Sequence, residues 1–307
     1  MDYKKIFKKR KTREFILRTL RFLPDKFMLK LIYRVKLKRK LNLKNPKRFS
    51  EKIQWLKLNY RNPIMIQITD KYDVRGFVEK RNYSHILNEC YGVYNSFDEI
   101  DFSLLPNQFV VKDTLGSGSV SVYLVKDKNK VDLKDLEKTV NKWISKKNQK
   151  LDDGREWAYR AGKKHRIIIE KYLKQKDEDL VDYKFLCFNG EPYVIAHDKA
   201  RFSNHQRSYF DVNWKKLNVK DREHAICDQV IERPENFKEM IKIAKDLSQG
   251  FPLLRVDLYN IEGKIVFGEL TCYPYSGLVQ FEPDEFDYLM GEKIILQKCK
   301  GGKNGSL

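Results

Sequence analysis

The chain has 307 residues, of which 41% are hydrophobic and 13% aromatic, so it can bury a sizeable core. Its formal net charge is +20, yet residues 1–50 alone hold 19 lysines and arginines against three acidic residues. The basic character therefore belongs mainly to an N-terminal arm, and the rest has the charge balance of an ordinary globular protein. No stretch approaches the roughly 18 apolar residues that a membrane-spanning helix needs.

The cysteines and the N-terminus bear on the compartment. Five cysteines are scattered along the chain, without CxxC spacing and without a cysteine–histidine ligand pattern. An odd number of cysteines with no such framework is typical of free thiols in a reducing compartment. The basic N-terminus is not followed by the apolar segment of a signal peptide. We therefore expect a cytoplasmic protein, with peripheral attachment to the inner face of the membrane as an open alternative.

Residues 1–48 are the basic arm, in which apolar residues mix with lysines and arginines. Pro24 separates two helical segments, and Asp25 is positioned to cap the second one. A basic amphipathic helix can lie on an anionic membrane surface. It can equally pack on the domain and show its charges to water. The sequence leaves both readings open.

Two helices follow the arm. Residues 50–60 begin at Ser50, a residue type that caps helices, and residues 69–81 begin in the same way. Further along, the apolar patterns predict a strand at 108–113, a glycine loop at 115–119, a strand at 120–127, a helix at 133–147 and a strand at 166–173. The first two of these strands form a hairpin around the glycine loop.

The C-terminal half contains two hairpins and a helix. Residues 182–198 turn at Asn189-Gly190, a dipeptide that strongly favours two-residue hairpin turns. A helix is expected at 233–248, and a second hairpin turns within Asn-Ile-Glu-Gly at 260–263. The predicted regions are an arm at 1–48, an N-terminal helical or α+β region at 49–107, a lid subdomain at 108–175, a C-terminal subdomain with a metal site at 176–298 and a disordered tail at 299–307.

Two carboxylates, Asp257 and Glu269, interrupt the apolar strands of the second hairpin. With a turn centred on residue 262 or 263, they lie on one face within about 5–8 Å of each other. Carboxylates so close repel unless a cation or a proton lies between them. Mg²⁺ commonly uses one or two carboxylates together with phosphates, and Arg255 on the same face can meet a phosphate. A half-solvated hairpin with outward polar residues is the alternative.

Lys112 ends a buried strand, directly before the glycine loop. Glycines let backbone N–H groups approach phosphate oxygens, and a lysine supplies a point charge. The loop matches neither GxxxxGK[ST] nor GxGxxG, and a plain glycine turn remains the alternative. Glu170, after three apolar strand residues, can accept from an adenine amino group or a ribose hydroxyl.

The order of these pieces resembles the ATP-grasp fold, in which two α+β subdomains clamp ATP. In detail the chain is similar to the TupA-like branch, named for teichuronopeptide biosynthesis, over about residues 48–293. The matching stretches are SEKIQWLKL, TDKYDVRGFV, FDEIDFSLLPNQFVVKD, DYKFLCFNGEPYVIAHD, RSYFDVNW, FPLLRVDLYNIEGKIVFGELTCYPYSG and FEPDEFDYLMGE.

The resemblance implies ATP and Mg²⁺ as cofactors and assigns residues to them. Lys112 and Arg255 would act in catalysis, on the phosphates and on the transferred phosphoryl group. The nucleotide would be held by Lys112, Gly116, Ser117, Gly118, Ser119, Glu170, Lys171, Leu173 and Lys184. Mg²⁺ would be held by Asp257, Glu269 and Thr271, the last standing where the wider fold usually has an asparagine.

The resemblance also implies a reaction. ATP-grasp enzymes typically phosphorylate a carboxylate to an acyl phosphate, which an amine attacks to give an amide, ADP and phosphate. The TupA-like branch is similar to proteins of capsule and cell-wall polysaccharide pathways, which implies a uronic acid or polyglutamate acceptor and an amine donor. Asp198, Arg201 and Arg207 are the candidates for binding the acceptor, although a solvated loop explains the two arginines equally well.

Two other functions compete with this one. A glycosyltransferase of polysaccharide biosynthesis would use a D-x-D metal motif, which Asp177-Glu178-Asp179 matches within a charged run. A nucleic-acid or membrane-binding protein without enzymatic activity would use the basic arm. The chain contains no recognised nucleic-acid module, and its aromatic residues are not interleaved with basic ones, so we expect no nucleic-acid partner.

Overall fold

The computed structural model describes residues 20, 22–116, 121–145, 154–161, 164–174, 180–199 and 205–297. Its strands are β1 (Cys90–Tyr94), β2 (Phe109–Asp113), β3 (Val122–Val125), β4 (Ile167–Lys171), β5 (Asp182–Phe188), β6 (Glu191–Lys199), β7 (Gln206–Asp211), β8 (Lys220–Asp221), β9 (Leu253–Ile261), β10 (Lys264–Thr271) and β11 (Phe281–Glu282). The helices are α3 (Asp25–Leu37), α4 (Phe49–Asn59), α5 (Ile64–Ile68), α6 (Asp73–Glu79), α7 (Leu133–Ile144), α8 (Trp157–Arg160), α9 (Phe237–Ser248) and α10 (Glu285–Lys293).

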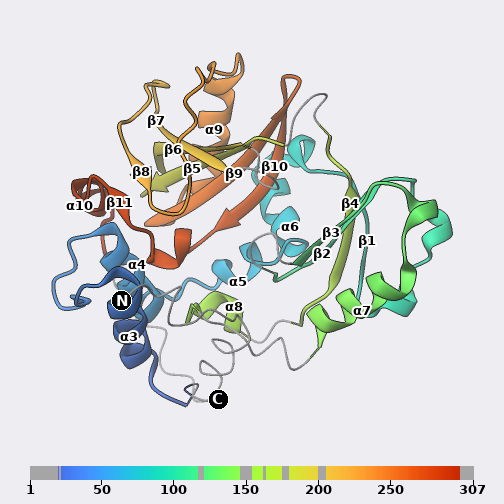
Figure 1. Ribbon diagram of the computed structural model, residues 1–307, viewed down its shortest axis with the longest axis horizontal. Coiled ribbons are helices and arrows are strands. Elements are labelled where there is room, and N and C mark those ends of the chain that lie inside the picture. Colours follow the sequence, from blue (N-terminus) through green and yellow to red (C-terminus); the bar gives the residue numbers. More distant parts are fainter. Residues whose placement is uncertain are drawn as a thin grey trace.

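Two antiparallel sheets dominate the molecule, with α5 and α6 between them (Figure 1). Sheet A has the strand order β1-β4-β2-β3, and sheet B has the order β10-β9-β5-β6-β7. A small third sheet joins β8 and β11. Both main sheets are covered by a helix on one face, α7 on sheet A and α9 on sheet B. The mixture of helices and antiparallel sheets agrees with the predicted α+β class.

Sheet A contains a strand that the sequence patterns did not assign to it. Strand β1 pairs with β4, so sheet A begins at Cys90, inside the region 49–107 that the sequence analysis set apart from the lid subdomain. The strand is short, and its register shifts between Cys90 and Gly92. That irregularity removes the period-two pattern by which a strand is recognised.

Sheet B has one apolar face and one charged face. Phe185, Val256 and Leu258 point toward α9, which packs on them through Phe237 and Met240. The alternation of side chains along each strand places the charged residues on the opposite face. The predicted hairpin of β5 and β6 is confirmed, with positive φ at both residues of its Asn-Gly turn.

The hairpin of β9 and β10 does bring Asp257 and Glu269 opposite each other, as predicted. Its turn, however, is centred between residues 262 and 263, with φ values of 51° and 81° at Glu262 and Gly263. Regular pairing from such a turn would place Gly268 opposite Asp257. A bulge at Gly268 adds one residue to β10, and the register shifts so that Glu269 takes that place.

Two predicted helix caps are wrong, because tertiary partners occupy their side chains. Helix α4 begins at Phe49 with Arg48 as its N-cap, while Ser50 donates from its backbone N–H and its hydroxyl to Asp287. Helix α3 has Pro24 at its N-cap position, and Asp25 makes no capping hydrogen bond. A capping pattern in the sequence is thus overridden where a buried carboxylate needs a donor.

Helix α3 of the arm packs on the domain, which was one of its two expected placements. Met28, Leu29, Tyr33 and Leu37 are buried against neighbours that include Leu58 of α4. None of the helices in the described ranges is long and apolar enough to cross a membrane. The predicted tail 299–307 lies outside the described residues.

We predict that Gly268→Val destabilises the hairpin that carries the two carboxylates. A Cβ atom at this position would lie 2.9 Å from the carbonyl oxygen of Asp257, so the backbone would have to shift. The expected loss is about 1–3 kcal/mol in the free energy of unfolding, measured by urea denaturation. Lys264→Val at the exposed end of the same strand is the control. Equal stability of the two variants would contradict the close approach at the bulge.

Candidate functional site

The charged face of sheet B carries a row of acidic and basic side chains joined by ion pairs, which we call the charge ladder. From β10 to β7, its members are Glu269, Arg255, Asp257, Lys184, Asp182, Asp198 and Arg207. Neighbouring strands lie about 4.8 Å apart, so side chains of the same face on adjacent strands come within ion-pair distance. The sequence predicted six of these seven residues as site residues, and the sheet brings those six together.

At one end of the ladder, Arg255 joins the two predicted metal ligands. Its Nε and Nη2 atoms donate to the two oxygens of Asp257 at 2.6 and 2.7 Å. Nη2 also donates to Oε1 of Glu269 at 2.6 Å, and the Thr271 hydroxyl donates to the same oxygen at 3.2 Å. A guanidinium group thus holds the two carboxylates together and offsets their repulsion.

In the middle of the ladder, Lys184 is surrounded by three carboxylates. Its Nζ atom lies 2.9 Å from Asp182, 3.4 Å from Asp198 and 3.5 Å from Asp257. Within the described residues, this buried nitrogen nevertheless makes no hydrogen bond of good geometry. Burial lowers the pKa of Lys184, but the charges of the three carboxylates outweigh burial, so this pKa is raised.

At the other end, Arg207 binds two carboxylates. Its Nη2 atom donates to Asp198 at 2.7 Å, and its Nη1 atom donates to Asp221 at 3.3 Å. The Tyr209 hydroxyl also donates to Asp221, at 2.9 Å. Arg207 and Asp198 are buried and bind each other, so the structure places both inside the ladder. Their role in acceptor binding stays a prediction.

Burial and charge act in opposite directions on the ladder. Burial alone would raise the pKa of Asp198, but Arg207 and Lys184 hold this pKa well below its usual range. At Asp257, burial outweighs the attraction of Arg255 and Lys184, so the pKa is raised. The ladder contains four carboxylates and three cationic side chains, so it carries one excess negative charge. A further cation beside Asp257 would favour its ionised form.

The residues present fit a magnesium ion held with phosphates. Within the described ranges, no three His, Cys, Asp or Glu side chains gather as a complete metal site. Asp257 and Glu269 supply two adjacent hard oxygen groups, and Mg²⁺ commonly completes its shell with phosphate oxygens and water. Arg255 occupies the bridging position in this structure. A metal between the carboxylates therefore requires its guanidinium group to move.

On sheet A, Lys112 and Glu170 lie together, the first predicted to bind phosphates and the second to bind the adenine or the ribose. Cross-strand pairing of Lys112 with Ile168 and of Val110 with Glu170 puts these side chains on one face. The Lys112 Nζ atom donates to Glu170 at 2.6 Å. Arg75 of α6 approaches the other oxygen of this carboxylate at 3.9 Å. This face of sheet A is therefore turned toward α6.

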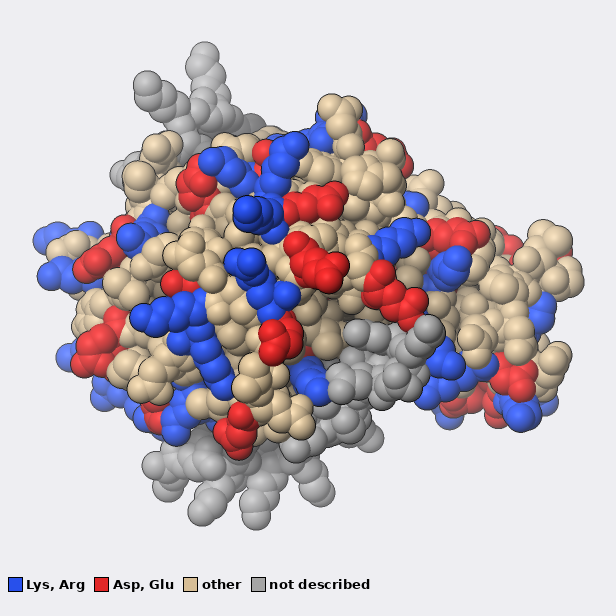
Figure 2. Space-filling view, turned by 90° about the horizontal axis from the view of Figure 1, so that it is seen from above, with Lys and Arg blue, Asp and Glu red and all other residues tan. Residues whose placement is uncertain are grey.

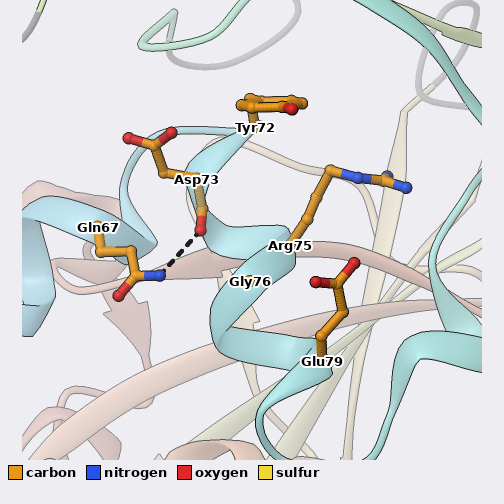
Figure 3. Close-up of a pocket in the computed structure, with 6 residues that line it drawn as sticks. All are labelled: Gln67, Tyr72, Asp73, Arg75, Gly76 and Glu79. Carbon is orange, nitrogen blue, oxygen red and sulfur yellow. Dashed lines mark hydrogen bonds between the residues drawn. The ribbon is translucent and has the colours of Figure 1, made fainter.

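A cavity of about 420 Å³ lies along α6 beside this pair. Figure 3 shows Tyr72 and Asp73 at the start of the helix, with Arg75 and Glu79 one turn apart. Gln67 donates to the backbone carbonyl of Asp73 at 3.1 Å and closes one side. Arg75 lines this cavity and lies 3.9 Å from Glu170, so the cavity adjoins the pair on the side of α6.

Lys71, which the sequence analysis did not single out, binds the end of β2 and the loop that follows it. Its Nζ atom donates to the carbonyl oxygens of Asp113, at 3.1 Å, and of Gly116, while its backbone N–H donates to Thr114. Burial lowers the pKa of this lysine, and the charge of Glu269 on sheet B opposes that effect. The stretch TDKYDVRGFV contains it, but no spacing rule connects Lys71 to a glycine loop forty residues later.

The turn Pro274–Gly277 (η6) covers the ladder. Tyr275 and Ser276 have positive φ values, 55° and 53°, and the Tyr275 ring lies 5.1 Å from the Arg207 guanidinium and 5.9 Å from that of Arg255. Gln54 and Lys57 of α4 donate to the Ser276 carbonyl, both at 2.9 Å. These contacts from α4 stabilise a backbone conformation that is unfavourable for residues other than glycine.

Several predicted residues are not tested by these contacts. Ser117, Gly118, Ser119, Arg201 and the Asp177–Asp179 motif lie outside the described residues. Gly116 accepts from Lys71. Lys171 is exposed and pairs with Glu89 at 3.3 Å, and Leu173 is half-buried beyond the end of β4. Their roles in binding a nucleotide stay predictions.

We predict that Arg207→Met is strongly destabilising, and less so in acid. The change leaves Asp198 and Asp221 buried without their common cation, which costs about 3–5 kcal/mol in the free energy of unfolding. Protonation neutralises such carboxylates, so the difference from the wild type should shrink as the pH falls from 8 toward about 5. Urea unfolding at several pH values measures this. A difference that is independent of pH would contradict the assignment.

This chain is similar to several solved structures of ligases. No curated protein matches the sequence. Similar solved structures include D-alanine–D-alanine ligases from Bacillus anthracis (19% identity, 67% of this chain and 57% of that chain, TM-score 0.41) and Helicobacter pylori (12%, 82% and 68%, 0.47). An L-amino acid ligase from Bacillus licheniformis is also similar (17%, 75% and 49%, 0.44). The chain thus spans little more than half of the Bacillus anthracis ligase.

A family model provides the stronger match. The TupA-like ATP-grasp model covers residues 51–295, which is most of the chain and includes both sheets and every residue of the charge ladder. The resemblance seen in the sequence is therefore confirmed: this protein belongs to the TupA-like ATP-grasp family and has the α+β ATP-grasp fold.

Proposed function

We propose that the protein is an ATP-dependent carboxylate–amine ligase. The observation that carries this proposal is the charge ladder with its Asp257–Glu269 pair, together with the buried Lys71, which lies within electrostatic range of both Glu269 on sheet B and Lys112 on sheet A. Two carboxylates for a metal, several lysines for phosphates and an arginine at the same place are the groups that phosphoryl transfer needs. Membership of an ATP-grasp family supports the same chemistry.

Mg²⁺-bound ATP would supply the phosphoryl group that turns a carboxylate into an acyl phosphate, from which an amine displaces phosphate to form an amide. The protein's part is to align the groups and to neutralise charge. Asp257 and Glu269 would hold the metal, with Thr271 beside them. Arg255, once released from the two carboxylates, would face the transferred group. Its covering ring, Tyr275, would limit the access of water.

In this proposal, lysines from both sheets contact the nucleotide. Lys112 on sheet A and Lys71 at the glycine loop would contact phosphates, and Lys184 would contact them from sheet B. Glu170, freed from Lys112, would accept from the ribose or the adenine, with Lys171 and Leu173 beside it. Helix α7 packs on the far side of sheet A and would move with that sheet as a lid.

The substrate we propose is an anionic carboxylate polymer, a uronic-acid-containing polysaccharide or a polyglutamate, joined to an amine donor. The excess of basic residues in the chain supports an anionic acceptor. Asp198, Arg201 and Arg207 remain our candidates for its binding. A place in capsule or cell-wall biosynthesis would follow from such a substrate.

The first test is calorimetric titration with a non-hydrolysable ATP analogue and Mg²⁺. We expect metal-dependent binding by the wild type, and binding at least about tenfold weaker in Asp257→Asn/Glu269→Gln, because the metal loses both anionic ligands. Asp228→Asn/Glu232→Gln is the matched control, since both residues are exposed and belong to the segment beside β7, at the opposite edge of sheet B from the strands of Asp257 and Glu269. No binding by the wild type would overturn the proposal.

The reaction itself is tested with hydroxylamine as the amine. An acyl phosphate formed from glucuronic acid or poly-γ-glutamate would be trapped as a hydroxamate, with release of ADP and phosphate. We expect this product with the wild type and not with Asp257→Asn/Glu269→Gln. Nucleotide binding without a hydroxamate or phosphate release from either acceptor would contradict the proposed substrate class while leaving nucleotide binding intact.

A further inference from the structure

Helix α3 presents an exposed stripe that has no role in the site. We call Lys26, Phe27, Lys30, Leu31 and Arg34 the α3 stripe; all five are exposed. Phe27, Leu31 and Arg34 follow one another at spacings of four and three residues, so they lie on one side of the helix. The opposite side is the one that packs on the domain. In Figure 1, α3 lies at the edge of the molecule.

The stripe combines exposed apolar groups with positive charge. Phe27 is 54% exposed, Leu31 is 39% exposed, and Phe22 just before the helix is 81% exposed. Residues 25–40 contain seven lysines and arginines and one acidic residue, Asp25. That carboxylate is already paired with Arg155 and Arg160, at 3.0 and 2.9 Å. Within the described ranges, no acidic side chain pairs with Lys26, Lys30 or Arg34.

We propose that the α3 stripe is a docking surface for an anionic lipid bilayer. Phe27 and Leu31 would enter the headgroup region, while Lys26, Lys30 and Arg34 would bind anionic headgroups beside them. A nucleic acid would also attract the charges, but it gives no reason for exposed apolar side chains beside them. The remaining residues of the arm, 1–19, add eight further basic residues to the same end of the chain.

The way α3 is held supports a docking function. Asp25 binds Arg155 and Arg160, and Arg155 also donates to the carbonyl of Leu23 at 3.0 Å. Leu278, directly after the turn Pro274–Gly277, belongs to the apolar cluster under α3. The helix is thus fixed to the part of the protein that covers the ladder. A bilayer bound to α3 would lie at a set distance from the site.

The rest of the surface gives a suitable contrast. Figure 2 shows the face seen from above Figure 1, where lysines and arginines are interspersed with acidic side chains. Helix α9, at the top of Figure 1, exposes Lys238 and Lys242 beside Glu239. These two lysines have the same spacing on a helix as Lys26 and Lys30, but no exposed large apolar side chain lies on α9. They provide a matched control.

The test is sedimentation of the full chain with vesicles, using phosphatidylcholine alone or mixed with phosphatidylglycerol. We expect binding only to the anionic vesicles, weakened by high salt. Lys26→Glu/Lys30→Glu should weaken it at least about tenfold, and Lys238→Glu/Lys242→Glu should change it little. Phe27→Ser/Leu31→Ser should also weaken binding to the anionic vesicles, although this variant keeps every charge. Nucleotide-analogue binding and thermal unfolding check that each variant is folded.

Other outcomes would overturn the proposal. These are equal binding to both vesicle types, an equal loss in the α3 and α9 variants, and full binding by Phe27→Ser/Leu31→Ser. A chain lacking residues 1–19 that no longer binds would assign the membrane contact to that segment instead of α3.

Displacement from vesicles is expected with soluble inositol hexaphosphate and not with an oligonucleotide of equal charge. Tighter binding to the oligonucleotide would identify a nucleic-acid surface, and dimers broken by Lys26→Glu/Lys30→Glu would identify a second copy. The proposal does not depend on the proposed ligase activity.

Discussion

The buried charge ladder on sheet B is the constraint on which the rest of the site depends. Ionised groups are costly to remove from water, and only close partners of opposite sign make such burial tolerable. The spacing of strands sets how near those partners come, so each ladder member needs a particular register on its strand. One slipped strand would turn its charges into the apolar core beneath α9. The strands of sheet B must therefore pair in one defined register for the ladder to form.

Several features of the fold act on that register. The Asn-Gly and Glu-Gly turns set the pairing of the strands that they connect. The bulge at Gly268 then shifts the register so that Glu269 lies opposite Asp257. The apolar face of the sheet prevents slippage because its large side chains are matched to α9. From the other side, α4 holds the turn that covers the ladder through Gln54 and Lys57. The contacts that stabilise sheet B consequently also set the geometry of the site.

The ladder is also unbalanced in a way that suits its proposed chemistry. Arg255 joins Asp257 and Glu269, and burial raises the pKa of Asp257 by more than Arg255 and Lys184 lower it. A divalent cation would offer more charge at the same place. Lys71, in the loop before α6, lies within electrostatic range of Glu269. An anionic ligand with a bound metal is complementary to these carboxylates and to this lysine.

The sequence by itself determined much of this. Turn dipeptides and period-two alternation identify the hairpins, and the charged residues inside apolar strands identify most of the ladder, because local chain geometry dictates which face they share. The tertiary structure alone decided the rest. Lys71, Lys57 and Tyr275 act through partners far away in the sequence, Ser50 serves Asp287 instead of capping its helix, and β1 joins a sheet whose other strands come much later. Such contacts depend on how separate elements pack, and no local pattern records them.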